Sequence, residues 1–268
     1  MRAYLIALIA AACAGATIQR AAAADLPAYK APIALPVYNW TGFYIGGNAG
    51  YGRGNANDTM ALGGNWLTDG TGDNLIVGPL GNGQLRPSGF TGGVQAGYNF
   101  QSGAWVLGIE VDANYFGLKD KFFRTVANGA PAFDSYAFSS SYRSDWLVTV
   151  RPRIGYAFDR WLVYATGGLA VANQKFAQSI NQLNLPFSEA GSVSRTTAGW
   201  TVGAGGEYAL DRRWSLKAEY LYVDPGSVSF ATVGACPPGV VGCTLYNASH
   251  SAHLKANIVR AGVNFRWE

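Results

Sequence analysis

Charged residues are scarce in this chain of 268 amino acids. They make up 13% of the sequence, against about 25% in an ordinary soluble domain. The formal net charge is only +4, and loss of an N-terminal segment containing Arg2 and Arg20 would lower it by two. Such a weak positive field argues against nucleic acid as a partner, because binding to a phosphate backbone requires a strongly basic surface.

Histidine and cysteine are also scarce. The two histidines, His250 and His253, stand three residues apart in an expected loop, and their spacing does not suit a zinc site. We therefore predict no metal site and no cofactor, with the two histidines as the weak alternative ligands. Cys236 and Cys243 flank the short segment CPPGVVGC. In an exported chain, two such close cysteines predict a disulfide, with two free thiols as the alternative.

Long hydrophobic runs are missing, which argues against a membrane-spanning helix and leaves an N-terminal anchor as the weaker alternative to a signal peptide. The apolar segment 4–16 is too short to span, but it follows a basic residue and precedes the A-x-A site at 22–24. This pattern predicts a signal peptide over 1–24, and cleavage after Ala23 fits almost as well. A Pro-rich periplasmic leader over 25–39 and a barrel domain over 40–268 then complete the chain.

Glycine and aromatic residues are abundant. The sequence has 35 Gly, 15 Tyr, 13 Phe and 8 Trp, and Gly occurs at roughly twice its usual share of about 7%. In WVLGIEVDANY (105–115), apolar residues alternate with small or polar ones, which is the period of a β-strand. The same period predicts eight strands in all, at 40–51, 89–100, 105–115, 145–158, 161–172, 199–210, 214–222 and 257–267.

The connections between these segments alternate in length. Short turns near 102–104, 159–160 and 211–213 alternate with long gaps such as 52–88. Short periplasmic turns and long external loops are typical of a transmembrane barrel, and aromatic residues gather at the short-turn ends of the strands as a girdle. We therefore predict an all-β fold, an eight-stranded antiparallel transmembrane up-and-down β-barrel.

Several segments resemble one family. They are ADLP, WTGFYIGGNAGYG, GGVQAGYNFQ, VRPRIGYAF, WTVGAGGEYAL, LKAEYLYVD and RAGVNFRW. Together they resemble the small outer-membrane immunogenic proteins, or porin-family proteins, of alphaproteobacteria, within the superfamily of OmpA-like eight-stranded barrels. The resemblance covers essentially the whole mature chain. It implies a place in the outer membrane, contact with outer-membrane lipid and lipopolysaccharide, and assembly by the barrel-assembly machinery.

Two local features are interpreted against this family. The chain end resembles a barrel-assembly signal formed by Arg260, Gly262, Phe265 and Trp267, although Glu268 follows the last aromatic residue. Pro152 stands where related sequences usually carry Gly. Because proline cannot donate to a strand ladder, we expect a bulge or a water-bridged carbonyl at Pro152.

Charged side chains are expected on the inward faces. Unpaired charges there would be very costly, so we predict a lumen charge network formed by Glu110, Asp112, Arg151, Arg153, Glu207, Lys217, Glu219, Arg260 and Arg266. The predicted register sets Glu110 near Arg153 and Asp112 near Arg151. Inward glycines argue for some open space in the lumen, whereas the charge pairs argue for a plug.

An enzyme is not expected. Glu110 and Asp112 have the spacing of some glycosidase carboxylates. The matching basic residues on the inward faces would form ion pairs with both carboxylates and leave neither free for catalysis. No Ser–His–carboxylate set suggests a lipid-modifying site. The predicted function is a structural surface protein of the outer membrane, with or without weak porin activity. The alternatives are a small-solute porin, or an adhesion or haemin-binding module that uses the long loops to contact a host surface.

Overall fold

The computed structural model describes residues 38–70, 72–127, 135–239 and 241–267. All of them belong to the unit Val37–Glu268. The predicted signal peptide and nearly all of the predicted leader lie outside the described residues. Within these ranges, no helix has both the length and the apolar character needed to cross a membrane.

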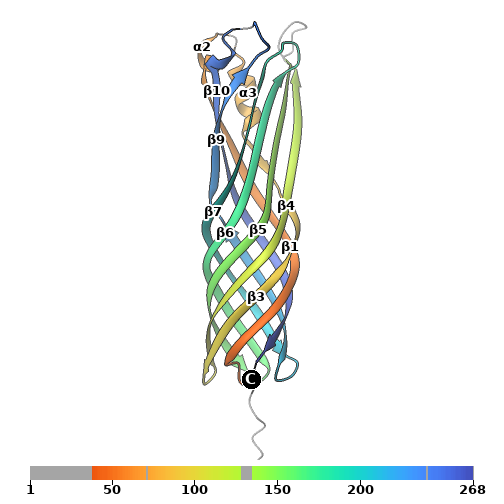
Figure 1. Ribbon diagram of the computed structural model, residues 1–268, viewed down its shortest axis with the longest axis vertical. Helices are drawn as coiled ribbons and strands as arrows, with labels where there is room; N and C mark the ends of the chain where they lie inside the picture. The colour runs from red at the N-terminus through yellow and green to blue at the C-terminus, as the bar shows by residue number, and fades with distance from the viewer. Residues whose placement is uncertain (1–37, 71, 128–134, 240, 268) are drawn as a thin grey trace, which may run out of the picture. The chain divides into compact units, whose positions relative to one another are not determined.

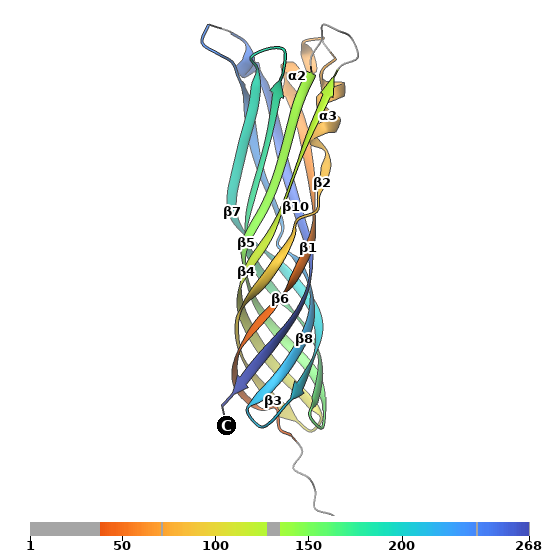
Figure 2. The same ribbon diagram turned by 90° about the vertical axis from the view of Figure 1, so that its right-hand side faces the viewer.

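The described chain forms a closed antiparallel barrel (Figures 1 and 2). Its strands are β1 (Gly42–Gly64), β2 (Gly83–Leu85), β3 (Ser88–Ser102), β4 (Trp105–Ala127), β5 (Ser135–Phe158), β6 (Trp161–Gln182), β7 (Ser188–Ala209), β8 (Trp214–Asp224), β9 (Ser227–Ala235) and β10 (Tyr246–Arg266). Short helices α2 (Asn65–Thr68) and α3 (Asn74–Gly81) and a 3-10 turn (Cys243–Leu245) lie at the loop end.

The ten strands occupy eight positions around the barrel, because two positions are each shared by two strands with a break between them. We call each of these eight positions a stave. β2 and β3 are separated by Arg86 and Pro87, and β8 and β9 by Pro225 and Gly226. β1 pairs with both β3 and β10, which closes the ring and leaves no lower edge exposed to lipid. The predicted eight-stranded antiparallel barrel is confirmed.

The strands are much longer than predicted. β4 has 23 residues, whereas about 9–11 residues cross a membrane. The predicted long loops contain much regular structure, so that prediction was wrong. The gaps 116–144, 173–198 and 223–256 are mostly strand, and the gap 52–88 contains the upper half of β1, α2, α3 and β2. Side chains of these upper halves pack inside the barrel, as Ala56 and Met60 of β1 do. This packing stabilises a barrel that continues beyond the bilayer.

The bulges lie away from Pro152. The register shifts between Tyr115 and Leu118 on β4, and between Arg143 and Leu147 on β5. It is unchanged across Pro152, so the predicted bulge there is wrong. The Thr166 hydroxyl donates to the Pro152 carbonyl at 2.9 Å, and the β6 residues facing this part of β5 are glycines. The ladder hydrogen bond that Pro152 cannot donate is thus missing, but no extra residue is inserted into the strand.

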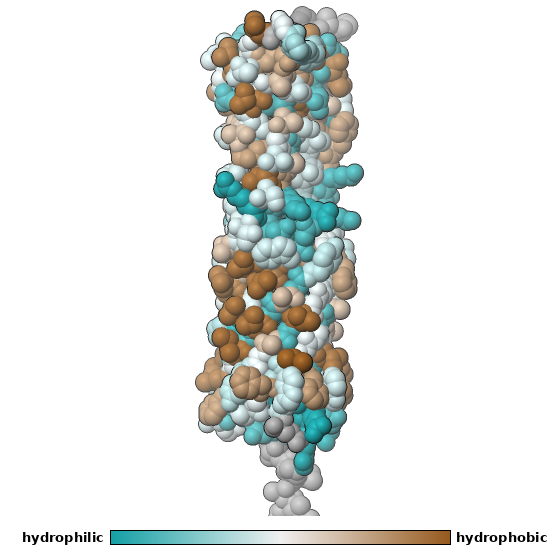
Figure 3. Space-filling view, viewed as in Figure 1, coloured by the Kyte–Doolittle hydropathy of each residue, from teal (hydrophilic) through white to brown (hydrophobic). Residues whose placement is uncertain are grey.

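Apolar side chains cover the lower part of the barrel wall on the face seen in Figure 3, and exposed large apolar residues lie on the lower parts of the other staves as well. On β4 the outward side chains of this apolar band run from Trp105 to Tyr115. Each of the large apolar ones is at least 44% exposed. Ten residues span about 33 Å along a strand, or about 25 Å along the axis of a barrel with strands tilted by about 40°. This is the height of the lipid-facing band of outer-membrane barrels.

Candidate functional site

The lumen contains a compact layer of buried charges within the height of the apolar band. Eight of the nine predicted residues take part, and each is at most 4% exposed: Glu110, Asp112, Arg151, Arg153, Glu207, Lys217, Glu219 and Arg260. Strands β4, β5, β7, β8 and β10 supply them. Four acids face four bases, so the layer has no net formal charge.

Glu110 is at the centre of this layer. Its Oε1 lies 2.6 Å from Arg151 Nη2 and 2.6 Å from Lys217 Nζ. Tyr44 donates its hydroxyl to Oε2 at 2.8 Å. Asp112 accepts from Arg151 at 2.7 Å and from Arg260 at 3.1 Å. Both carboxylates are therefore saturated with donors, which is the arrangement that makes a buried charge tolerable.

The observed register differs from the predicted one. Glu110 lies opposite Arg151, and Arg153 lies opposite Gly108, so the predicted register was wrong by two residues on one strand. The two expected contacts nevertheless occur diagonally. Asp112 pairs with Arg151, and Glu110 lies 3.5 Å from Arg153. The arginine side chains are long enough to reach the acid of the neighbouring pair.

Arg266 lies apart from the charged layer, which corrects its assignment to the network. Its guanidinium stacks over Tyr38 at 4.4 Å and donates to the Arg212 carbonyl at 3.0 Å. Arg266 is the last residue of β10 and so stands at the periplasmic rim, where these two contacts hold its guanidinium. Phe265 and Trp267 form an edge-to-face pair at the same rim.

Tyrosines fill the space that the inward glycines leave. A side chain at Gly97 would meet the Tyr44 hydroxyl at 2.3 Å, and one at Gly205 would meet the Tyr164 hydroxyl at 2.5 Å. Tyr164 donates to Glu219 at 2.8 Å, as Tyr44 does to Glu110. The glycines therefore make room for these rings, and the argument that they leave an open lumen is wrong at these positions.

Apolar layers lie on both sides of the charges. Towards the loops, the barrel is filled by side chains that are at most 1% exposed: Phe116, Leu118, Tyr142, Leu147, Phe176, Leu221, Val223, Leu254 and Ile258. Towards the periplasm, Trp40, Val106 and Leu162 form a second cluster. The charged layer is thus held in a low-dielectric interior, where unbalanced charge is most costly.

A second polar layer lies in the upper, external part of the barrel. His250 contacts Gln178 Oε1 at 2.5 Å and Thr232 Oγ1 at 2.7 Å. Gln178 also donates to Asp58, and Thr232 donates to Glu189. His250 was expected in a solvated loop, but it is a buried residue of β10. Its inward position follows from the strand extension described above.

His253 also lies in β10, and its Nε2 is 2.9 Å from Asp224 Oδ1. Within the described residues, no group of three or more His, Cys, Asp or Glu side chains could hold a metal ion. Cys236 and Cys243 are joined by a disulfide that closes the loop between β9 and β10.

His250 provides a test of the upper polar layer. Burial lowers its pKa from 6.5 to about 4, so the neutral ring stabilises the fold above pH 6.5 and this stabilisation is lost as the pH falls towards 4. We expect wild type to lose roughly 1–2 kcal/mol more than His250→Gln between pH 7 and pH 4.5. Urea unfolding, followed by gel mobility, measures this; His253→Gln is the matched control. Identical pH profiles for wild type and His250→Gln would contradict the assignment.

Sequence reasoning missed several residues of the lumen. Tyr44 and Tyr164 sit on segments where glycine and alanine blur the two faces, and their hydroxyls were not assigned partners. Gln95 and Asn264 link to each other at 2.6 Å and, through Asn264, to Glu207 at 2.8 Å. Their inward positions were readable from the alternation, but their partners depend on how the staves are arranged around the ring.

The comparisons agree with this architecture. Residues 8–266 match the family model of the outer membrane protein beta-barrel domain. The chain is 33% identical over 275 residues to the 31 kDa outer-membrane immunogenic protein of Brucella melitensis, covering 100% of both chains. It is 30% identical to the 22 kDa outer membrane protein of Rhizobium leguminosarum, over 74% of this chain and 69% of the relative.

Among solved structures, the outer membrane protein OprG of Pseudomonas aeruginosa is similar with a TM-score of 0.45 and 12% identity. That similarity covers 86% of this chain and 99% of OprG. The full-length matches in sequence confirm the predicted outer-membrane location. This chain belongs to the outer-membrane β-barrel family that includes the outer-membrane immunogenic proteins.

Proposed function

We propose that this protein is a structural component of the outer membrane whose lumen is closed to solutes. The observation that carries the proposal is the neutral layer of eight buried charges held between two apolar layers. A solute or ion that crosses the barrel would have to displace contacts such as Arg151–Glu110 and Lys217–Glu110, both 2.6 Å long. Breaking a buried ion pair costs several kcal/mol.

We further propose that the protein is not an enzyme. Glu110 and Asp112 each bind several cations, which leaves neither carboxylate free to transfer a proton. His250 and His253 are hydrogen-bonded to Gln178, Thr232 and Asp224. These contacts support structural roles for all four residues.

Planar-bilayer conductance tests the closed lumen. Refolded wild-type protein, checked by the shift in gel mobility on heating, is expected to show no steady unitary currents in concentrated KCl. A general porin measured in the same bilayers serves as the control for insertion. Steady currents that scale with salt concentration would overturn the proposal and favour the porin alternative.

A further inference from the structure

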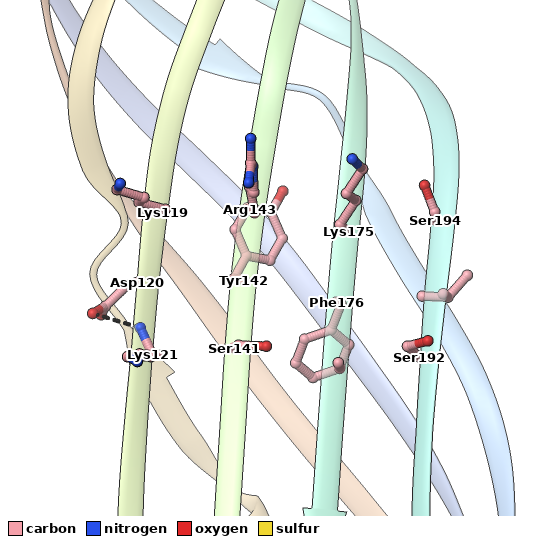
Figure 4. A pocket seen from close by; sticks show the side chains of 12 residues that line it. Lys119, Asp120, Lys121, Ser141, Tyr142, Arg143, Lys175, Phe176, Ser192 and Ser194 are labelled. Atoms are coloured by element: carbon pink, nitrogen blue, oxygen red, sulfur yellow. Dashed lines mark hydrogen bonds between the residues drawn. The ribbon is translucent and has the colours of Figure 1, made fainter.

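Basic side chains gather on the outer wall directly above the apolar band. Lys119, Arg143 and Lys175 face outward on β4, β5 and β6, and consecutive members lie opposite each other in the strand register. Figure 4 shows the three in one row across neighbouring strands. Like charges placed directly opposite each other destabilise a sheet, so nearby anions would stabilise this row.

The protein supplies only part of the compensating charge. Asp145, which the β5 bulge turns outward, binds Arg143 and lies 2.9 Å from Lys175. Asp120 accepts the backbone N–H groups of Arg86 and Lys121. Within the described part of the chain, Lys119 and Lys121 have no ion-pair partner. Four cations thus face two carboxylates, one of which is held by backbone donors.

The row lines a concave surface. A groove of about 700 Å³ runs over β4 to β7, and its outward lining includes the four basic residues and three hydroxyls, those of Ser141, Ser192 and Ser194. Lys and Arg are cationic ligands of phosphate oxygens, and hydroxyls add neutral donors. The lining chemistry therefore fits a phosphorylated ligand with more than one anionic oxygen.

The height of the groove indicates where that ligand comes from. Lys119 is four residues beyond Tyr115, the upper end of the apolar band on β4. Four residues correspond to about 13 Å along the strand and about 10 Å along the axis. The polar headgroup region extends about 5–8 Å beyond the hydrocarbon core on each side, so the row lies at its outer edge and the long side chains reach into it. Trp146 and Trp200 are exposed on the lipid side below the groove, where they suit acyl chains.

From these observations we propose that the groove formed by Lys119, Lys121, Arg143 and Lys175 binds the phosphate groups of an acylated glycolipid of the outer leaflet, such as lipopolysaccharide. The acyl chains of the same molecule lie against the apolar wall below. This binding neutralises the row of like charges and anchors the external half of the barrel to the leaflet. The proposal rests on the outer-membrane location and does not depend on whether the lumen conducts.

The test measures lipopolysaccharide binding by refolded protein in detergent at 150 mM NaCl. One Lys or Arg beside an anionic lipid surface contributes about fivefold in affinity, so the triple variant Lys119→Gln, Arg143→Gln, Lys175→Gln is expected to bind about a hundredfold more weakly. The control variant Arg53→Gln, Arg212→Gln, Lys255→Gln removes three exposed charges that do not line the groove. It is expected to lose less than about fivefold.

Two further measurements identify the ligand chemistry. Dephosphorylated lipopolysaccharide is expected to bind wild type about as weakly as intact lipopolysaccharide binds the triple variant. Inorganic phosphate at millimolar concentration is expected to compete poorly, because it lacks the acyl chains. Equal losses in the triple and control variants would reduce the groove to general surface charge and overturn the proposal. Undiminished binding of the dephosphorylated lipid, or full competition by free phosphate, would also overturn it. Heat-shifted gel mobility verifies that every variant is folded.

Discussion

Glu110→Gln is expected to lower the free energy of unfolding by about 3–5 kcal/mol. The substitution keeps the size of the side chain but leaves Arg151 and Lys217 without the carboxylate that both contact at 2.6 Å. Three acids would then face four bases in a layer enclosed by apolar side chains. Urea titration of the refolded protein, with the folded fraction read from gel mobility, measures the change.

A second substitution separates charge balance from the loss of one contact. Glu110→Gln combined with Lys217→Met restores neutrality, because three acids then face three bases. Replacing both partners of a buried pair is often nearly neutral, so the double variant should recover most of the stability lost in Glu110→Gln. If the two losses simply add, the charged layer does not act as a balanced unit and our description of it is wrong.

Phe116→Ala should destabilise the barrel by about 3–5 kcal/mol. Phe116 is 0% exposed and packs inside the barrel in the apolar layer above the charges. Gly52 on β1 leaves room for it, since a side chain there would contact Leu118 and Phe116. Truncation to alanine removes the ring and leaves a cavity that a closed ring of strands collapses into poorly.

Phe123→Ala is the matched control on the same strand. Phe123 points outward from β4 and is 70% exposed, so its removal should change the unfolding free energy by less than about 0.5 kcal/mol. The same urea titration serves both variants. Similar losses at the two positions would show that the upper barrel is not packed as described.

Within the membrane, the sequence alone determined the fold. The outward residues of β4 from Trp105 to Tyr115 are large and apolar because they face lipid, and the inward ones are small or polar. This alternation, repeated eight times with short turns at one end, permits only a closed barrel. It also identified the inward charges, because Glu110 and Asp112 share one face of a strand.

Above the membrane, the alternation continues but the two faces exchange character: the outward residues are polar and the inward residues are apolar. On β1, Arg53 and Asn55 face water while Ala56 and Met60 pack inside. Outward apolar residues end at the membrane surface, so their alternation predicts loops where the upper strands lie. The inversion of the pattern is itself a sequence signal, and the change from Tyr51 to Arg53 marks it.

The partners of each lumen charge could be decided only by the tertiary structure. Arg151 meets residues of β4 and β8, and Lys217 of β8 reaches Glu110 across the lumen. These contacts depend on the stagger of the strands and on which staves face each other across a ring, whereas strand periodicity defines only the face on which a residue lies. The sequence therefore determined which residues enter the lumen, and the closure of the barrel decided which of them pair.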